Sequence, residues 1–254
     1  MVDDLLIKMI NQVKIVDIRA YVIDQAGSGG DYHDQEAGHW ILDSKISTPM
    51  STYLDFKNSR TSFGINVMKS IVVEVEASDG SIGVSTGQGG APACYMIEQH
   101  FRRFIVGLDP RDINKAWDQM YRASMYYGGK GLPMWAISVV DLALWDLLGV
   151  IRNEPVYKMI GGSVRDEIEL YCTGIRPDAA KEAGFIGGKM PLPFAPVDRH
   201  EGLKANVEHF QEMRNKVGSD FWLMADCWMS LDVSYAVELA NAMQDVDLYW
   251  IEEA

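Results

Sequence analysis

Three segments in the first part of the chain show the alternation of apolar and polar residues that is typical of half-buried β-strands. The first is VKIVDIRAYVID (13–24), and the other two lie within SIVVEVEASDGSIGVSTG (70–87). Those two flank Asp79 and Gly80, a dipeptide that strongly favours a hairpin turn. The pattern therefore predicts three antiparallel strands. The intervening residues 25–69 are polar, and a loop of this length is usually functional or disordered.

The spacing of apolar residues then becomes helical. ACYMIEQHFRRFIVG (93–107) ends at a glycine, which is a common helix terminator. In DPRDINKAWDQMYRAS (109–124) we interpret Asp109 as the helix cap and Pro110 as the first-turn proline. LPMWAISVVDLALWDLLGVIRN (132–153) is apolar almost all round, so it is predicted to be deeply buried.

The last third of the chain contains short apolar runs without alternation, as expected for parallel strands buried on both faces. These runs are EIELYCTG (167–174), AGFIGGKM (183–190), FWLMADCW (221–228) and DLYWIEEA (247–254). Helical stretches at 198–218 and 231–246 separate the later runs, an order that predicts a parallel sheet wrapped by helices. We therefore expect an α+β domain over residues 1–130 and a β/α domain over residues 131–254.

The composition excludes several classes of partner. A net charge of −13 argues against nucleic acid or an anionic membrane, since both require a concentrated basic surface. The 3 cysteines show neither a disulfide framework nor zinc-ligand spacing, which favours a reducing compartment. Residues 1–14 lack a signal core, and no apolar run reaches the roughly 20 residues that cross a bilayer. A soluble, cytoplasmic protein is expected.

Two acidic residues follow successive predicted strands, Asp226 after FWLMA and Glu252 after LYWI. Neighbouring parallel strands lie about 4.8 Å apart, so carboxylates at their carboxyl ends share one space and repel unless a cation lies between them. Carboxylate oxygens suit Mg²⁺, and β/α folds place their active sites at this end of the strands. Alternatively, each acid caps the next helix. The repeated placement favours a metal site, with Glu253 facing away.

Several long motifs give the chain a family resemblance. They are GGDYHDQ (29–35), SRTSFGINV (59–67), IVVEVEASDG (71–80), GGKMPLP (187–193), DFWLMADCWMSLDV (220–233) and WIEEA (250–254). Together they resemble the enolase superfamily in its mandelate racemase-like branch, and most closely its L-rhamnonate dehydratases. The resemblance extends over essentially the whole chain. It implies an α+β capping domain (1–130) followed by a TIM-type (β/α)₈ barrel whose first strands are present in 131–254.

The activity that this resemblance implies is the Mg²⁺-dependent dehydration of a sugar acid, L-rhamnonate, to 2-keto-3-deoxy-L-rhamnonate by a hydro-lyase. Removing the proton next to a carboxylate creates an enediolate, and a metal held by Asp226 and Glu252 would stabilise the added negative charge. Loss of the 3-hydroxyl group as water then follows with proton assistance. The resemblance also implies a homo-oligomer. The alternatives are a dehydratase or racemase acting on another aldonate, and a truncated, non-catalytic fragment.

The resemblance assigns further site residues by position. His33 and Arg60 would contact the substrate from capping loops, since a guanidinium can grip carboxylate or hydroxyl oxygens in a bidentate manner. Without the resemblance, both would be read as solvated side chains. Lys189 is either a catalytic residue or a structural charge near the carboxylates, and Trp228 either lines the pocket or serves in packing.

A complete barrel of this type needs about 250 residues, and only about 120 follow the expected capping domain. The family's third metal carboxylate and its His-Asp base would lie beyond residue 254. Three explanations are open: a longer polypeptide, one half of a split enzyme, or a truncated relative without activity. We expect the first, because a chain rarely ends inside a buried strand.

Overall fold

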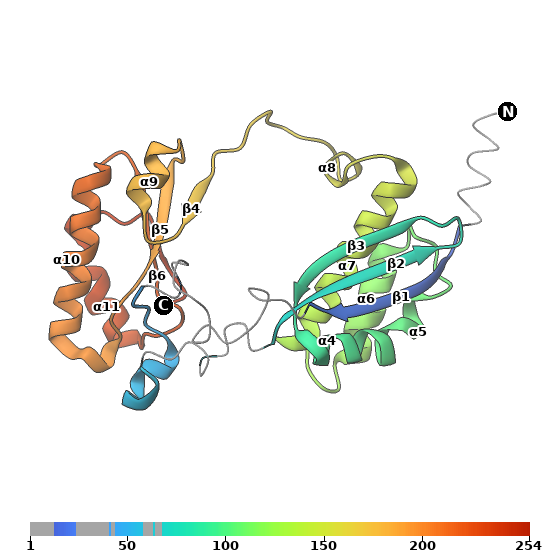
Figure 1. Cartoon of the computed structure of the whole chain (residues 1–254), viewed down its shortest axis with the longest axis horizontal. Helices are drawn as coiled ribbons and strands as arrows, with labels where there is room; N and C mark the ends of the chain where they lie inside the picture. Colours follow the sequence, from blue (N-terminus) through green and yellow to red (C-terminus); the bar gives the residue numbers. More distant parts are fainter. Residues whose placement is uncertain (1–12, 24–40, 42–43, 58–62, 64–67) are drawn as a thin grey trace. The chain divides into compact units, whose positions relative to one another are not determined.

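The structure is a computed structural model of the chain, and it describes residues 13–23, 41, 44–57, 63 and 68–254. The chain divides into two units, each with its own hydrophobic core (Figure 1). The first unit contains Met1–Gly30 and Asn66–Val164, and the second contains Asp31–Ile65 and Arg165–Ala254.

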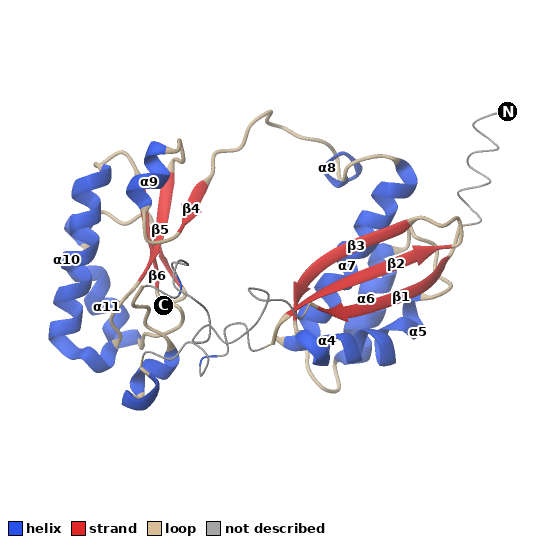
Figure 2. Cartoon of the chain, in the orientation of Figure 1, coloured by secondary structure: helices blue, strands red, loops and turns tan. Residues whose placement is uncertain are grey.

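The sheet of the first unit is antiparallel, in the order β1-β2-β3, as predicted (Figure 2). The strands are β1 (Ile15–Val22), β2 (Ser70–Ala77) and β3 (Ile82–Gln88). At the hairpin between β2 and β3, Gly80 has a φ of 86°, a conformation that glycine adopts without steric cost. The alternation of apolar residues thus identified all three strands.

Helices cover this sheet, and two of them differ from the prediction in detail. The expected helix at 93–107 is a continuous helical stretch made of α4 (Gly90–Met96), a π-helical turn (Ile97–Phe101) and α5 (Arg102–Ile105). Helix α6 (Ile113–Ser124) begins four residues later than Asp109. The carboxylate of Asp109 instead binds the backbone N–H and the guanidinium of Arg111, which holds a turn ahead of the helix.

Helix α7 (Leu132–Arg152) packs against β2 and β3 in the first unit. Glycines on β3 permit the close approach: a Cβ on Gly83 would lie 2.3 Å from the carbonyl oxygen of Ala143. The predicted deep burial applies to one face of the helix only, because Leu142 and Val150 on the other face are 55% and 50% exposed. By length and hydropathy alone α7 could span a membrane, but its packing is that of a core helix.

The position of α7 also moves the boundary between the two parts of the chain. The sequence placed it at residue 130, whereas the first unit continues through α7 and the short helix α8 (Val156–Met159) to Val164. The physical reason is that α7 buries its apolar face against the antiparallel sheet. It is therefore part of the first core and not the opening of the β/α region.

The second unit contains a parallel sheet in the order β4-β5-β6-β7, as the predicted fold class requires (Figure 2). Its strands are β4 (Tyr171–Thr173), β5 (Gly187–Pro191), β6 (Trp222–Asp226) and β7 (Ile251–Glu252). The connections hold α9 (Pro177–Glu182), α10 (Arg199–Val217) and α11 (Val233–Ala242). Helix α9 was not predicted, since its six residues are too few to show helical periodicity.

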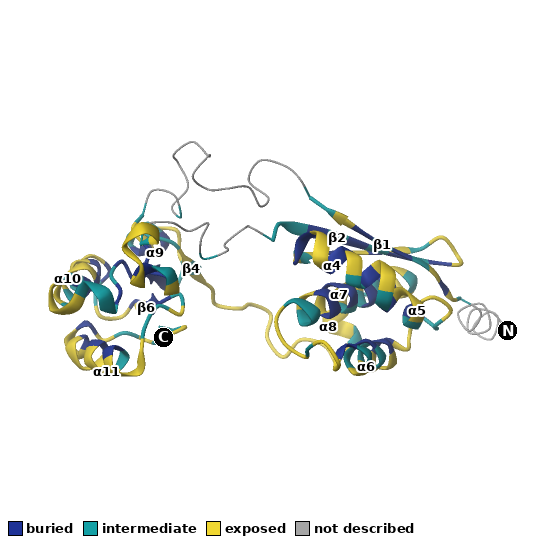
Figure 3. Cartoon of the chain, turned by 90° about the horizontal axis from the view of Figure 1, so that it is seen from below, coloured by how far each residue is buried: buried dark blue, intermediate teal, exposed yellow. Residues whose placement is uncertain are grey.

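Burial on both faces, expected for all four strands, applies only to the central pair. Every residue of β5 is buried, as are four of the five in β6, whereas the edge strands β4 and β7 contain no buried residue. Helices α10 and α11 turn buried residues inward and exposed residues outward (Figure 3). The carboxyl ends of β5 and β6 are thus the best-enclosed part of this sheet.

The second unit also includes residues 44–57, which come from the long loop predicted between β1 and β2. They form two short 3₁₀ helices, Pro49–Thr52 and Leu54–Phe56. Within this segment Ile46, Ser47 and Thr48 are buried. The predicted loop therefore contains ordered backbone that belongs to the unit with the parallel sheet.

Candidate metal centre

Asp226 and Glu252 are the last residues of β6 and β7, and they lie directly opposite one another in the parallel pairing of these strands. Asp226 is 9% exposed and Glu252 is half-buried. Trp228 donates its backbone N–H to Asp226 Oδ1 at 3.2 Å, and Trp250 donates its indole N–H to Glu252 Oε2 at 3.0 Å. The two carboxylates therefore meet at one edge of the sheet.

Lys189, on β5, joins the two carboxylates. Its Nζ lies 3.0 Å from Asp226 Oδ2 and 2.5 Å from Glu252 Oε1, and the residue is only 7% exposed. Burial by itself would lower the pKa of Lys189, but hydrogen bonds and charge attraction from Glu252 and Asp226 outweigh it and raise the pKa above its usual value. A buried positive charge thus fits between the two acids.

The alternative role of Asp226, as the cap of the next helix, is filled by another residue. Helix α11 has Asp232 as its N-cap, and the Asp232 carboxylate accepts the backbone N–H of Tyr235 at 2.8 Å. Asp226 stands six residues earlier, at the strand end. Asp226 therefore does not cap helix α11, and helix capping does not explain why its charge is buried.

The backbone after both strands is held in an unfavourable conformation. Trp228, Met229 and Glu253 have φ values of 48°, 57° and 48°, a region that side chains other than glycine rarely adopt. Two hydrogen bonds fix it: Cys227 N–H to the Glu252 carbonyl at 2.9 Å, and Met229 N–H to the Glu253 carbonyl at 2.7 Å. Such strain concentrates at functional sites, because surrounding structure must enforce it.

The donor set fits a hard divalent cation. Two carboxylates at neighbouring strand ends offer oxygen ligands, which Mg²⁺ prefers, and the rest of its shell is usually water or substrate oxygen. Within the described ranges, no group of three or more His, Cys, Asp or Glu side chains could hold a metal. Cys227 is buried beside Asp226, and burial, with the nearby negative charges, raises its pKa to about 12, so the thiol stays protonated.

The other predicted residues fall in different places. His33 and Arg60 lie outside the described residues. Trp228 is half-buried with its ring centroid 6.3 Å from that of Phe63, a contact consistent with packing. Glu253 is exposed, as expected.

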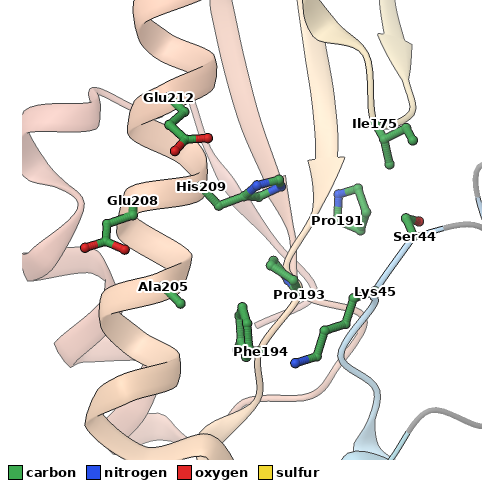
Figure 4. Close-up of a pocket in the computed structure, with 10 residues that line it drawn as sticks. All are labelled: Ser44, Lys45, Ile175, Pro191, Pro193, Phe194, Ala205, Glu208, His209 and Glu212. Carbon is green, nitrogen blue, oxygen red and sulfur yellow. The ribbon is translucent and has the colours of Figure 1, made fainter.

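Figure 4 shows a cavity of about 550 Å³ whose lining residues do not include the two carboxylates. It is lined by Ser44, Lys45, Ile175, Pro191, Pro193, Phe194, Ala205, Glu208, His209 and Glu212. The ammonium group of Lys45 lies 3.5 Å from the centroid of the Phe194 ring, which is a cation–π contact. None of the residues at the candidate metal centre lines this cavity, so we do not assign the chemistry to it.

An α+β unit followed by a parallel β/α sheet with acids at successive strand ends is the arrangement of the enolase superfamily. Residues 47–161 match the family model for the N-terminal domain of mandelate racemase and muconate lactonizing enzyme, and residues 177–254 match that for the enolase C-terminal domain-like family. The chain belongs to the mandelate racemase branch of the enolase superfamily.

Within this family the chain is similar to two rhamnonate dehydratases and, more distantly, to a racemase. It is 54% identical to an L-rhamnonate dehydratase of Saccharopolyspora erythraea, over 95% of this chain and 61% of that protein. A crystal structure of rhamnonate dehydratase from Gibberella zeae complexed with Mg has 57% identity and a TM-score of 0.89, over 94% of this chain and 59% of that one. A Streptomyces coelicolor racemase with bound magnesium has 28% identity and a TM-score of 0.68, over 94% and 62%. The chain thus spans about three fifths of the length of these relatives.

Proposed function

We propose that the protein is a Mg²⁺-dependent hydro-lyase that converts L-rhamnonate to 2-keto-3-deoxy-L-rhamnonate. Identity of 54% and 57% to rhamnonate dehydratases supports this reaction class and substrate. The single observation that carries the proposal is the pair of carboxylates, Asp226 and Glu252, which lie opposite one another at the ends of β6 and β7 and both contact the ammonium group of Lys189.

Asp226 and Glu252 would hold the metal, and bound Mg²⁺ would supply positive charge where the substrate carboxylate gains electron density. Strand pairing and the fixed backbone after each strand already bring the two side chains to one edge of the sheet. Asp226 is buried and Glu252 is half-buried, so electrostatic attraction at this edge of the sheet is stronger than at a fully exposed surface.

Lys189 contributes a positive charge at the same edge of the sheet. Its ammonium group donates to both carboxylates, which supports a role in holding them together rather than in taking a proton from the substrate. His33 and Arg60 are proposed substrate contacts from the capping loops, on the resemblance alone. A cytoplasmic location and a homo-oligomeric state complete the proposal.

The test is a substrate panel with the intact protein. L-rhamnonate and other six-carbon sugar acids are incubated with Mg²⁺, and 2-keto-3-deoxy products are quantified. We expect L-rhamnonate to be the preferred substrate and EDTA to abolish turnover. Turnover of a different aldonate would keep the reaction class and change the substrate. The absence of turnover with every acid would contradict the dehydratase proposal in favour of a non-catalytic role.

A further inference from the structure

Residues 44–57, here called the strap, contact both loops that flank Asp226. Ser47, which is 2% exposed, donates its backbone N–H to the Leu192 carbonyl at 2.8 Å and places its hydroxyl 2.9 Å from the same oxygen. The Ser47 hydroxyl also lies 2.8 Å from the hydroxyl of Ser230. Leu192 follows β5 and Ser230 follows β6, so a single side chain of the strap connects two loops at the carboxyl end of the sheet.

The contacts continue from these loops to the metal ligand. Leu192 donates its backbone N–H to the Asp226 carbonyl at 2.8 Å, so both polar backbone groups of Leu192 are engaged, one by Ser47 and the other by Asp226. Leu192 is fully buried between Pro191 and Pro193, whose rings restrict the backbone on either side. A displacement of the strap is therefore passed to Asp226 through a stiff connection.

The contacts of Ser230 link it both to Ser47 of the strap and to the residue that follows Asp226. Ser230 donates its hydroxyl to the Cys227 carbonyl at 2.7 Å, and Cys227 directly follows Asp226. The two hydroxyl groups have one proton each and lie within hydrogen-bond distance in three contacts, Ser47 with Leu192, Ser47 with Ser230, and Ser230 with Cys227, so only two of the three can be hydrogen bonds at one time. Neither serine can be removed without changing what the other one binds.

A second anchor fixes the far end of the strap. The ammonium group of Lys57 pairs with Asp198 Oδ1, while Asp198 Oδ2 accepts the backbone N–H of Ala195 at 3.1 Å. The side chains of Lys57 and Asp198 are 24% and 12% exposed, so this pair is partly shielded from solvent. The strap is thereby attached at both ends to the segment between β5 and α10.

We propose that Ser47 and Ser230 are positioning residues for the metal carboxylate Asp226, and that docking of the strap and binding of Mg²⁺ are coupled. The inference rests on the proposed function, since it takes Asp226 as a ligand. Groups that orient metal ligands typically change metal affinity by about 10–100-fold when they are removed. Coupling between two binding events is reciprocal, so bound Mg²⁺ also stabilises the docked strap.

The test is the dissociation constant for Mg²⁺, measured by titration calorimetry with the intact Ser47→Ala protein. We expect it to rise about 10-fold, at the lower end of that range because Ser47 acts through Leu192 and not on the carboxylate itself. General destabilisation has a different signature, because it lowers the number of binding sites and leaves their affinity unchanged. Ser230→Ala provides a second, half-buried variant with the same expectation.

A matched control exists in the first unit. Ser85 is buried and donates its hydroxyl to the Val139 carbonyl at 2.6 Å, so Ser85→Ala also removes a buried serine hydrogen bond. It should leave the affinity for Mg²⁺ unchanged. In the double variant, Ser47→Ala with Ser230→Ala, the loss of affinity should be smaller than the product of the single losses, because the two hydroxyls share one network.

Hydrogen exchange gives a readout that needs no activity. In the metal-free protein, the Leu192 amide should exchange faster in Ser47→Ala than in the parent, and Mg²⁺ should slow exchange of the Ser47 amide in the parent. If Ser47→Ala changes neither the Mg²⁺ affinity nor the exchange of Leu192, the coupling is wrong and the proposed function stands. If the parent protein fails to bind Mg²⁺, both are overturned.

Discussion

The two units differ in where their charged side chains lie: half-buried on one face of the sheet in the first unit, and buried in the second. In the first unit, β2 buries every second residue, and its other face carries half-buried charges such as Glu74 and Glu76, which pair with Arg19. In the second unit, β5 is buried on both faces and still includes Lys189. Among the described residues, all three buried charged side chains, Lys189, Arg214 and Asp226, belong to the second unit.

The location of the buried charges indicates which unit serves mainly in packing and which contains the groups suited to chemistry. Removing charges from water is costly unless they are paired or fully hydrogen-bonded, so a fold retains them where they serve a structural or functional purpose. Among the residues of the first unit that the structure describes, the buried polar side chains are Ser85 and Ser124, each bonded to a backbone carbonyl. The first unit can therefore be understood as a packed scaffold, and the second as the unit that concentrates charge at strand ends.

The largest expected effect follows from neutralising the paired acids. Asp226→Asn or Glu252→Gln in the intact protein should lower kcat/KM by at least about 100-fold, since each removes charge that would hold the metal. Steady-state assays and Mg²⁺ titration measure this. Glu74→Gln, the same change on a strand of the first unit, should leave kcat/KM within about twofold. Unchanged rates in both site variants would remove these acids from the catalytic centre.

Core truncations test whether the two cores are independent. Leu144→Ala in the first core and Leu223→Ala in the second should each cost about 2–5 kcal/mol, because both side chains are buried in separate clusters. Hydrogen exchange should localise each loss to its own unit. Leu142→Ala, at an exposed position on α7, should change stability by less than about 0.5 kcal/mol. Loss of protection in both units from either truncation would show that they unfold together.

Of the three buried charged side chains among the described residues, Arg214 forms its hydrogen bonds with backbone carbonyls and not with a carboxylate. Its guanidinium donates to four backbone carbonyls, those of Gly218, Phe221, Val246 and Asp247, at 2.6 to 2.8 Å. Arg214→Leu should destabilise the second unit by about 3 kcal/mol, because it leaves enclosed carbonyls without donors.

Chemical denaturation of the Arg214→Leu protein measures this loss. Arg122→Leu is the matched control, since Arg122 forms an exposed pair with Asp118, and it should cost less than about 0.5 kcal/mol. Equal losses from the two substitutions would contradict the importance of burial for the Arg214 contacts.

The smallest effect is expected at the charged face of the first unit. Burial tends to raise the pKa of Asp17, but hydrogen bonds from Arg102 and Arg19 outweigh it and lower the pKa below its usual value. The stabilisation from Asp17 is therefore present above about pH 4 and is lost as the pH falls through the folded-state pKa.

Asp17→Asn should accordingly cost less than about 1 kcal/mol at pH 7, and the difference from the parent should shrink as the pH falls below about 4. Urea denaturation across this range measures it. A difference that grows towards acid pH would show that the sign of the pKa shift is wrong.

Local pattern determined most of the architecture. Alternation identified β1, β2 and β3, and short apolar runs without alternation identified the four parallel strands. Acids after the last two of these runs placed Asp226 and Glu252 at the ends of β6 and β7. Short or context-dependent features were missed. Helix α9 is too brief for periodicity, and α7 was assigned to the wrong side of the domain boundary because an apolar helix does not itself specify which sheet it covers.

The sequence by itself determined the elements, their order and the residue types at the strand ends, because these depend on neighbours a few positions apart. Only the tertiary structure decided that Lys189 joins the two acids and that Ser47 meets Leu192 and Ser230, which lie 145 and 183 residues away. Such contacts have no local sequence signature, since they form only when the fold brings together segments that are far apart in the sequence. Local sequence placed Asp226, Glu252 and Lys189 on their strands, and the packing of the strands into one sheet decided that these three side chains pair.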